Sequence, residues 1–173
     1  MNNRITCIAM FDDESIRKIE NTISILNHNL CKVPYGIENR ENNDTLPYHF
    51  TISVWEEKYE EEIIEMFKTI KFEEIEIVIN NIDIKPSFNN SYNLYFKISS
   101  NDKLNMLQKY VFNKLPSEKY NPEIFIPHIT IHVDNNYEII KTMKDKINYV
   151  PNSITIKFNK LGLYKIYPAK KIL

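Results

Sequence analysis

Two His-x-Thr motifs are the residues of this sequence best suited to catalysis. The first begins at His49 and the second at His128. An imidazole with a pKa of about 6.5 accepts or releases a proton near neutral pH, so the two histidines could act as base and acid in one turnover. The hydroxyls of Thr51 and Thr130 could donate hydrogen bonds to phosphoryl oxygens, where negative charge builds up in the transition state. Together the motifs predict metal-independent cleavage of a phosphodiester.

The residues around the first motif predict a β-strand, in which side chains alternate between two faces. We expect its polar face to carry His49, Thr51, Ser53 and Trp55, and its core face to carry Phe50, Ile52 and Val54. On a strand, a histidine and a threonine two positions apart are separated by about 6.6 Å, which is enough to bracket one phosphate group.

The second motif repeats this division, with His128, Thr130, His132 and Asp134 expected on the polar face. His128 and His132 also raise the question of a metal, because histidines four positions apart chelate zinc on a helix. The β-branched residues between them predict a strand instead, on which the two imidazoles would stand about 13 Å apart. We therefore expect no metal and no cofactor, and we leave His132 out of the catalytic set.

A single His-x-Thr would carry little weight, because a histidine beside a β-branched residue is usually a half-exposed strand residue. Here two of the four histidines follow the pattern, and a proline, Pro47 or Pro127, stands within two positions before each. Each motif also occupies the corresponding place in a repeated order of elements, which favours a shared function.

The elements that must hold the motifs occur in two similar series. The first predicts strand, helix, loop, motif strand, helix and strand at residues 4–11, 16–26, 28–46, 49–55, 63–70 and 75–84. The second predicts strand, helix, loop, motif strand and helix at residues 92–99, 104–115, 116–127, 128–134 and 140–147, followed by two short strands at 153–158 and 161–167. Repetition of this kind indicates two equivalent lobes. We expect one α+β domain over residues 1–173, with halves of about 1–86 and 91–173.

Packing of these halves about a pseudo-twofold axis would bring the motif strands face to face. The expected architecture is therefore bilobal, with two mainly antiparallel sheets that line a central cleft and helices on the outside. Clefts between lobes are common binding sites for small ligands.

Composition narrows the range of partners. The 22 basic and 23 acidic side chains nearly cancel, so no strong positive field is present to bind duplex DNA. No run approaches the roughly 20 apolar residues that span a bilayer, and the short apolar run at 5–11 predicts a first strand rather than a signal peptide. Cys7 and Cys31 lack CxxC spacing, which indicates reduced thiols. We expect a cytoplasmic monomer.

The motifs resemble those of the two-histidine (2H) phosphoesterase superfamily, which includes the bacterial 2′-5′ RNA ligase and cyclic phosphodiesterase proteins. The similar segments are PYHFTI at 47–52 and FIPHITI at 125–131, and the segment at 161–166 resembles the closing strand of the family. The resemblance implies a bilobal α+β fold and metal-free hydrolysis of 2′,3′-cyclic or 2′,5′-linked phosphodiesters. It also implies catalytic roles for His49, Thr51, His128 and Thr130.

The substrate is less defined than the chemistry. We expect a nucleotide or a short RNA, with Tyr48, Phe125 and Tyr35 as candidate surfaces on which a base could stack. Aromatic residues at strand starts pack into cores more often than they bind ligands. The loops at 28–46 and 116–127 are expected to select the substrate. Two alternative functions are RNA ligation at the same site and nucleotide binding without turnover. The motifs do not distinguish which histidine is the acid and which is the base.

Overall fold

The computed structural model describes residues 4–24, 48–87, 90–99, 101–117, 120–147, 153–166 and 170–173. These residues form seven strands, four α-helices and one short 3-10 helix. The strands are β1 (Arg4–Phe11), β2 (His49–Glu56), β3 (Ile75–Pro86), β4 (Tyr92–Ile98), β5 (His128–Asp134), β6 (Ile154–Ile166) and β7 (Lys170–Lys171). The helices are α1 (Asp13–Ile23), η1 (Glu57–Tyr59), α2 (Glu60–Thr69), α3 (Asp102–Lys114) and α4 (Tyr137–Ile147).

Side-chain caps fix the starts of two helices. The Asp12 carboxylate accepts a hydrogen bond from the backbone N–H of Ser15 at 2.7 Å and begins α1. The Asn101 side chain does the same for the N–H of Leu104 at 3.1 Å and begins α3. Each helix then buries an apolar stripe against the sheet, α1 on β6 and α3 on β2.

All strand pairs are antiparallel, and the strand order is β2-β1-β6-β3-β4-β5, with β7 on β6. The expected α+β class is therefore confirmed. The two expected sheets are joined into one by hydrogen bonds, because the first part of β6 pairs with β3 and the rest pairs with β1. In space, β1 and β2 are completed by β6 from the end of the chain, whereas β3 joins β4 and β5.

The prediction of two short strands near the C-terminus is wrong, because β6 is one continuous strand. Its pairing partner β1 places Phe158 opposite Phe11 and Lys160 opposite Met10, so Asn159 is an extra residue that forms a bulge. The bulge accommodates the residues between the two expected strands without breaking the strand.

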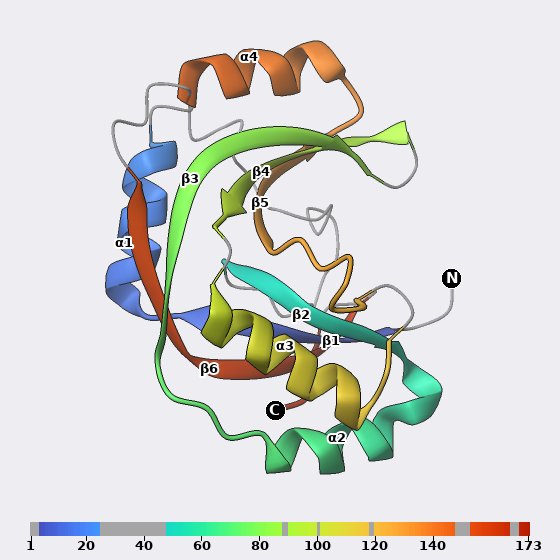
Figure 1. Ribbon diagram of the computed structural model, residues 1–173. Coiled ribbons are helices and arrows are strands. Elements are labelled where there is room, and N and C mark those ends of the chain that lie inside the picture. Colours follow the sequence, from blue (N-terminus) through green and yellow to red (C-terminus); the bar gives the residue numbers. More distant parts are fainter. Residues whose placement is uncertain are drawn as a thin grey trace.

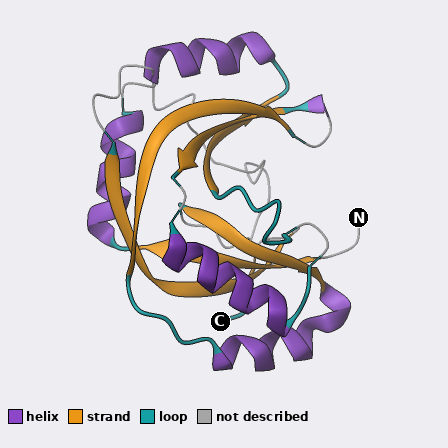
Figure 2. Ribbon diagram, viewed as in Figure 1, coloured by secondary structure: helices purple, strands orange, loops and turns teal. Residues whose placement is uncertain are grey.

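The two motif strands lie at opposite edges of the sheet, yet they contact each other. The sheet curls so that its two edges face each other. β3 arches over β4 and β5, and β1 and β2 lie across from them (Figure 1). Helix α4 packs on β3, β4 and β5, whereas α3 packs on β2 and α1 on β6. Figure 2 shows α4 and α2 at opposite ends of the curled sheet. The curl brings strands 72 or more residues apart in sequence into contact.

Within the described part of the chain, no helix is long and apolar enough to cross a membrane.

Candidate active site

The middle residue of each motif fixes the motif strand to the core. Phe50 and Ile129 are both fully buried. The Phe50 ring packs edge-on against Phe158 of β6, with centroids 5.1 Å apart, and lies 5.9 Å from Phe11 of β1. Burying such a side chain contributes about 1.5 to 3 kcal/mol, so the histidine and threonine on either side are held on the opposite face of the strand.

The first motif is followed at once by a β-bulge. His49 lies opposite Met10 of β1 and Thr51 opposite Ile8, but the register then shifts so that Ser53 lies opposite Cys7. Ile52 is the extra residue. Residues opposite each other in a pair of strands share a face, so the histidine and threonine share one face, as the sequence predicts.

The second motif is followed by a bulge at the matching position. His128 lies opposite Lys97 of β4 and Thr130 opposite Tyr95, and the register then shifts so that His132 lies opposite Leu94. The extra residue here is Ile131, which corresponds to Ile52 of the first motif. The two halves therefore repeat a backbone irregularity as well as a sequence motif.

These bulges correct the expected strand faces beyond the threonines. Ser53 and Trp55 turn toward the core side with Cys7 and Ile5, and Trp55 donates from its indole nitrogen to the Leu115 carbonyl at 2.9 Å. Val54 moves to the opposite face, outside the core cluster. The prediction for these residues is wrong because a bulge inserts one residue and reverses the alternation after it.

The same reversal removes His132 from the site face, which is the face of β5 that carries His128 and Thr130. It pairs with Leu94, which belongs to the core cluster, and is 9% exposed. Its Nε2 lies 3.7 Å from the carboxylate of Asp134, so this neighbour also leaves the site face. His128 and His132 thus point to opposite sides of β5, and the expectation that they share a face is wrong.

The structure brings the two motif histidines into electrostatic contact. Strands β2 and β5 touch, and the charge of His49 is one of the influences that lower the pKa of His128. His49 is 8% exposed and His128 is partly buried. The arrangement places two imidazoles and two threonine hydroxyls on facing strands.

The hydrogen bonds of His128 define its tautomer. Its Nδ1 lies 3.0 Å from the carbonyl oxygen of Ile126, and a carbonyl can only accept, so Nδ1 carries the hydrogen. Its Nε2 lies 2.7 Å from the Nζ of Lys85, which can only donate. The Nε2 lone pair of a neutral imidazole is therefore the acceptor.

Burial is the main reason that the pKa of His128 falls from 6.5 to about 4, followed by the positive charge of Lys85. The hydrogen bond to the Ile126 carbonyl acts in the opposite direction, and the charge of His49 adds a smaller lowering. At neutral pH this imidazole is uncharged and able to take up a proton.

Lys85 is the site residue that the sequence did not reveal. It lies near the end of β3, opposite Asn93 of β4, and its ammonium is 5.3 Å from the centre of the Tyr95 ring. The Tyr95 ring in turn packs edge-on against His128, with centroids 5.4 Å apart. The alternation of Asp83 and Lys85 could have indicated that β3 continues past residue 84. Nothing in the sequence connects Lys85 with a histidine 43 residues later.

The expected stacking residues have mixed positions. Tyr48 and Phe125 are partly buried and pack against the hydrophobic core. Tyr35 and the loop at 28–46 lie outside the described residues. Of the second loop, Ile124 and Ile126 are 64% and 65% exposed just before the motif histidine, so apolar surface is present beside the site.

The described residues contain no group of three or more His, Cys, Asp or Glu side chains that could hold a metal ion. Cys7 is a free, buried thiol whose pKa is raised by burial, and Cys31 lies outside the described part of the chain.

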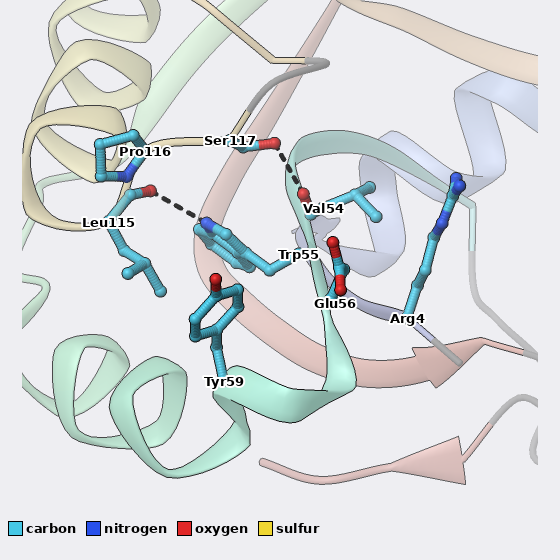
Figure 3. Close-up of a pocket in the computed structure, with 8 residues that line it drawn as sticks. All are labelled: Arg4, Val54, Trp55, Glu56, Tyr59, Leu115, Pro116 and Ser117. Atoms are coloured by element: carbon cyan, nitrogen blue, oxygen red, sulfur yellow. Dashed lines mark hydrogen bonds between the residues drawn. The ribbon is translucent and has the colours of Figure 1, made fainter. Parts of the chain in front are cut away.

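A separate concavity of about 400 Å³ lies at the other end of β2 (Figure 3). Trp55 and Tyr59 line it together with Leu115 and Pro116, and the Ser117 hydroxyl donates to the Val54 carbonyl at 2.6 Å beside it. Arg4 and Glu56 add two charged side chains to its lining, and no motif residue lines it.

Comparison with solved structures identifies the fold. No family model and no curated protein sequence matches the chain. Kluyveromyces marxianus Usb1 is similar with a TM-score of 0.54 and 11% identity, over 99% of this chain and 96% of that one. E. coli LigT complexed with 3′-AMP also gives 0.54 and 11%, over 95% of this chain and 88% of LigT. Both are members of the 2H phosphoesterase superfamily.

The chain has the 2H phosphoesterase fold. The resemblance that the motifs suggested is therefore supported over nearly the full length of the chain, although identity is too low for a sequence match. The contact between Lys85 and His128 and the paired bulges are observed in the structure of this chain itself.

Proposed function

We propose that this protein is a metal-independent phosphodiesterase that hydrolyses 2′,3′-cyclic or 2′,5′-linked nucleotide phosphodiesters. The observation that carries the proposal is the meeting of two motif histidines on facing strands, one of them held neutral with its Nε2 lone pair inside the site. The solved structures that share the fold include Usb1 with uridine monophosphate and LigT with 3′-AMP, which is consistent with a nucleotide substrate.

The environment of His128 favours the role of general base. Its Nδ1–H is held by the Ile126 carbonyl, so Nε2 carries the lone pair that can take the proton of a water molecule. The water oxygen forms a bond to phosphorus, and the bond from phosphorus to one ribose oxygen breaks. His49 donates a proton to that departing oxygen. Thr51 and Thr130 donate hydrogen bonds to the non-bridging oxygens, on which negative charge accumulates.

Recognition of the base is assigned to the starts of the motif strands. Tyr48 directly precedes His49, and Phe125 lies three residues before His128. Each ring packs against the core with part of its surface, and the remaining surface is proposed to stack on a base.

The test is a substrate panel with purified protein in EDTA. It comprises the four 2′,3′-cyclic nucleotides, a 2′,5′-linked dinucleotide and its 3′,5′-linked isomer as the control, with products identified by chromatography and mass spectrometry. We expect a cyclic or 2′,5′-linked substrate to be hydrolysed and the 3′,5′ isomer to remain intact. Recovery of every substrate unchanged would overturn the proposal. Tight binding by calorimetry without turnover would point instead to a binding module.

A further inference from the structure

Lys85 differs in its contacts from the other partly buried lysines of the described residues. Lys144 pairs with Asp83 at 3.0 Å, Lys157 pairs with Glu74 at 3.1 Å, and Lys165 pairs with Glu57 and Glu60, both at 2.7 Å. Lys85 forms no ion pair with any carboxylate in the described ranges of the chain. Its ammonium contacts the His128 imidazole and lies near the Tyr95 ring instead.

Among the described residues, this arrangement leaves the Lys85 ammonium without a carboxylate partner. A buried charge is costly unless it is paired, and burial accordingly lowers the pKa of Lys85 as well as that of His128. With Nζ and Nε2 only 2.7 Å apart, a proton on both groups would place two positive charges in contact. A negatively charged group beside the two nitrogens would relieve both costs.

We propose that Lys85 is the anion-binding residue of the site, and that a substrate phosphoryl oxygen takes over its ammonium hydrogen bond from Nε2 of His128. This inference rests on the proposed function and adds a substrate-binding residue to it. In the free protein the ammonium occupies the lone pair that the reaction needs. In the complex the phosphoryl oxygen holds the ammonium, Nε2 is released to face the attacking water, and the negative charge raises the proton affinity of His128. One binding event therefore holds the substrate and prepares the base.

Other charged and titratable groups face His128 from the strands around it. They are Tyr95 and Lys97 on β4 and His49 on β2, with the Asp83–Lys144 pair beyond Tyr95. Lys97 lies directly opposite His128 but is exposed, and Lys144 is already paired. Lys85 is the group in contact with Nε2. Lys97→Met is therefore the matched control, since it removes the same charge next to the same histidine without removing the contact.

The first experiment needs no turnover. The pKa of the His128 ring is measured by NMR in the wild type, Lys85→Met and Lys97→Met, each with and without inorganic phosphate. In the wild type we expect phosphate to raise that pKa. In Lys85→Met we expect phosphate affinity to fall about tenfold or more, as for loss of a charged hydrogen bond, and the pKa of free His128 to be higher than in the wild type. Lys97→Met should resemble the wild type.

Either of two results overturns the inference: phosphate affinity within twofold of wild type in Lys85→Met, or equal effects in Lys85→Met and Lys97→Met. Thermal unfolding by circular dichroism verifies that each variant is folded, and Lys85→Arg keeps the charge if Lys85→Met does not fold. The arginine variant should retain phosphate affinity within about tenfold.

Steady-state kinetics on the best substrate of the panel then separates the two proposals. Lys85→Met should lower kcat/KM about tenfold or more and move the acidic limb of its pH profile upward, and Lys85→Arg should restore part of the rate. An inactive wild type that binds phosphate through Lys85 contradicts the proposed function alone. An active wild type with an unaffected Lys85→Met contradicts this inference alone.

Discussion

The two halves of the site share a motif and a bulge but differ in the strands beside them. In the first half His49 and Thr51 lie opposite Met10 and Ile8, both apolar. In the second half His128 lies opposite Lys97, with Lys85 in contact. The repeated backbone places two equivalent His and Thr pairs, and the neighbouring strands give the two pairs different surroundings. An acid and a base can thus be distinguished by their neighbours although their motifs are alike.

The largest expected effect comes from removing either motif histidine. His49→Ala and His128→Ala should each lower kcat/KM by about a hundredfold to ten-thousandfold, because each would lose a proton-transfer step. His132→Asn is the matched control, since this histidine lies on the same strand as His128 but faces the core side. Its kcat/KM should stay within about threefold of wild type once folding is verified. A His132 variant as impaired as the His128 variant would contradict the placement of the second bulge.

These bulges also show where prediction from the sequence ends. The α+β class and the positions of most elements follow from local residue types, as in the apolar stripes of the helices. A bulge depends on how a neighbouring strand is paired, and the residues around Ile52 and Ile131 do not predict it. Contact between Lys85 and His128 depends on three strands in register, so it too is a property of the assembled sheet.

The next effect is on stability and involves the second half only. The pKa of His128 is about 4 in the folded protein and 6.5 in the unfolded reference, so between these values the unfolded chain binds a proton that the folded chain does not. The contribution of neutral His128 to the free energy of unfolding is fully present above pH 6.5. It falls as the pH drops toward 4, by about 3 kcal/mol in all. Below pH 4 this group causes no further loss.

Urea unfolding at pH 7, 5.5 and 4 measures this loss, and His128→Asn isolates it. The asparagine does not titrate, whereas the carboxylates are the same in both proteins and cancel in the difference. We expect the wild type to lose more stability than His128→Asn over this range. Parallel curves would show that His128 titrates normally and that its surroundings do not hold it neutral.

The threonines test whether the halves are equal in stabilising the phosphoryl group. Thr51→Val and Thr130→Val keep the side-chain shape and remove one hydrogen-bond donor each. We expect each to lower kcat by about tenfold to a hundredfold with little change in stability, in the range seen for single donors to a developing oxyanion. Serine at either position should restore most of the rate. A valine variant with unchanged kcat would assign phosphoryl stabilisation in that half to another group, which in the second half would be Lys85.

The smallest expected effect comes from a substitution at Gly162, behind the first motif. Gly162 of β6 lies opposite Ile8, and a Cβ there would come within 2.8 Å of the Tyr164 ring and 2.9 Å of the Met10 sulfur. Gly162→Ala should therefore cost about 1 to 3 kcal/mol, or roughly 2 to 4 °C in Tm for each kcal/mol. Asn159→Ala, at the exposed bulge of the same strand, is the control and should change Tm little.

The same substitution separates the two histidines by NMR. Met10 lies opposite His49, and its strand β1 does not pair with β5, which carries His128, so a displaced Met10 should shift the ring signals of His49 and leave those of His128 nearly unchanged. Equal shifts of both imidazoles would mean that the two halves respond as one body. A shift confined to His49 would mean that each half sets the environment of its own histidine, so the acid and the base could be tuned separately by substitutions on the strands beside them.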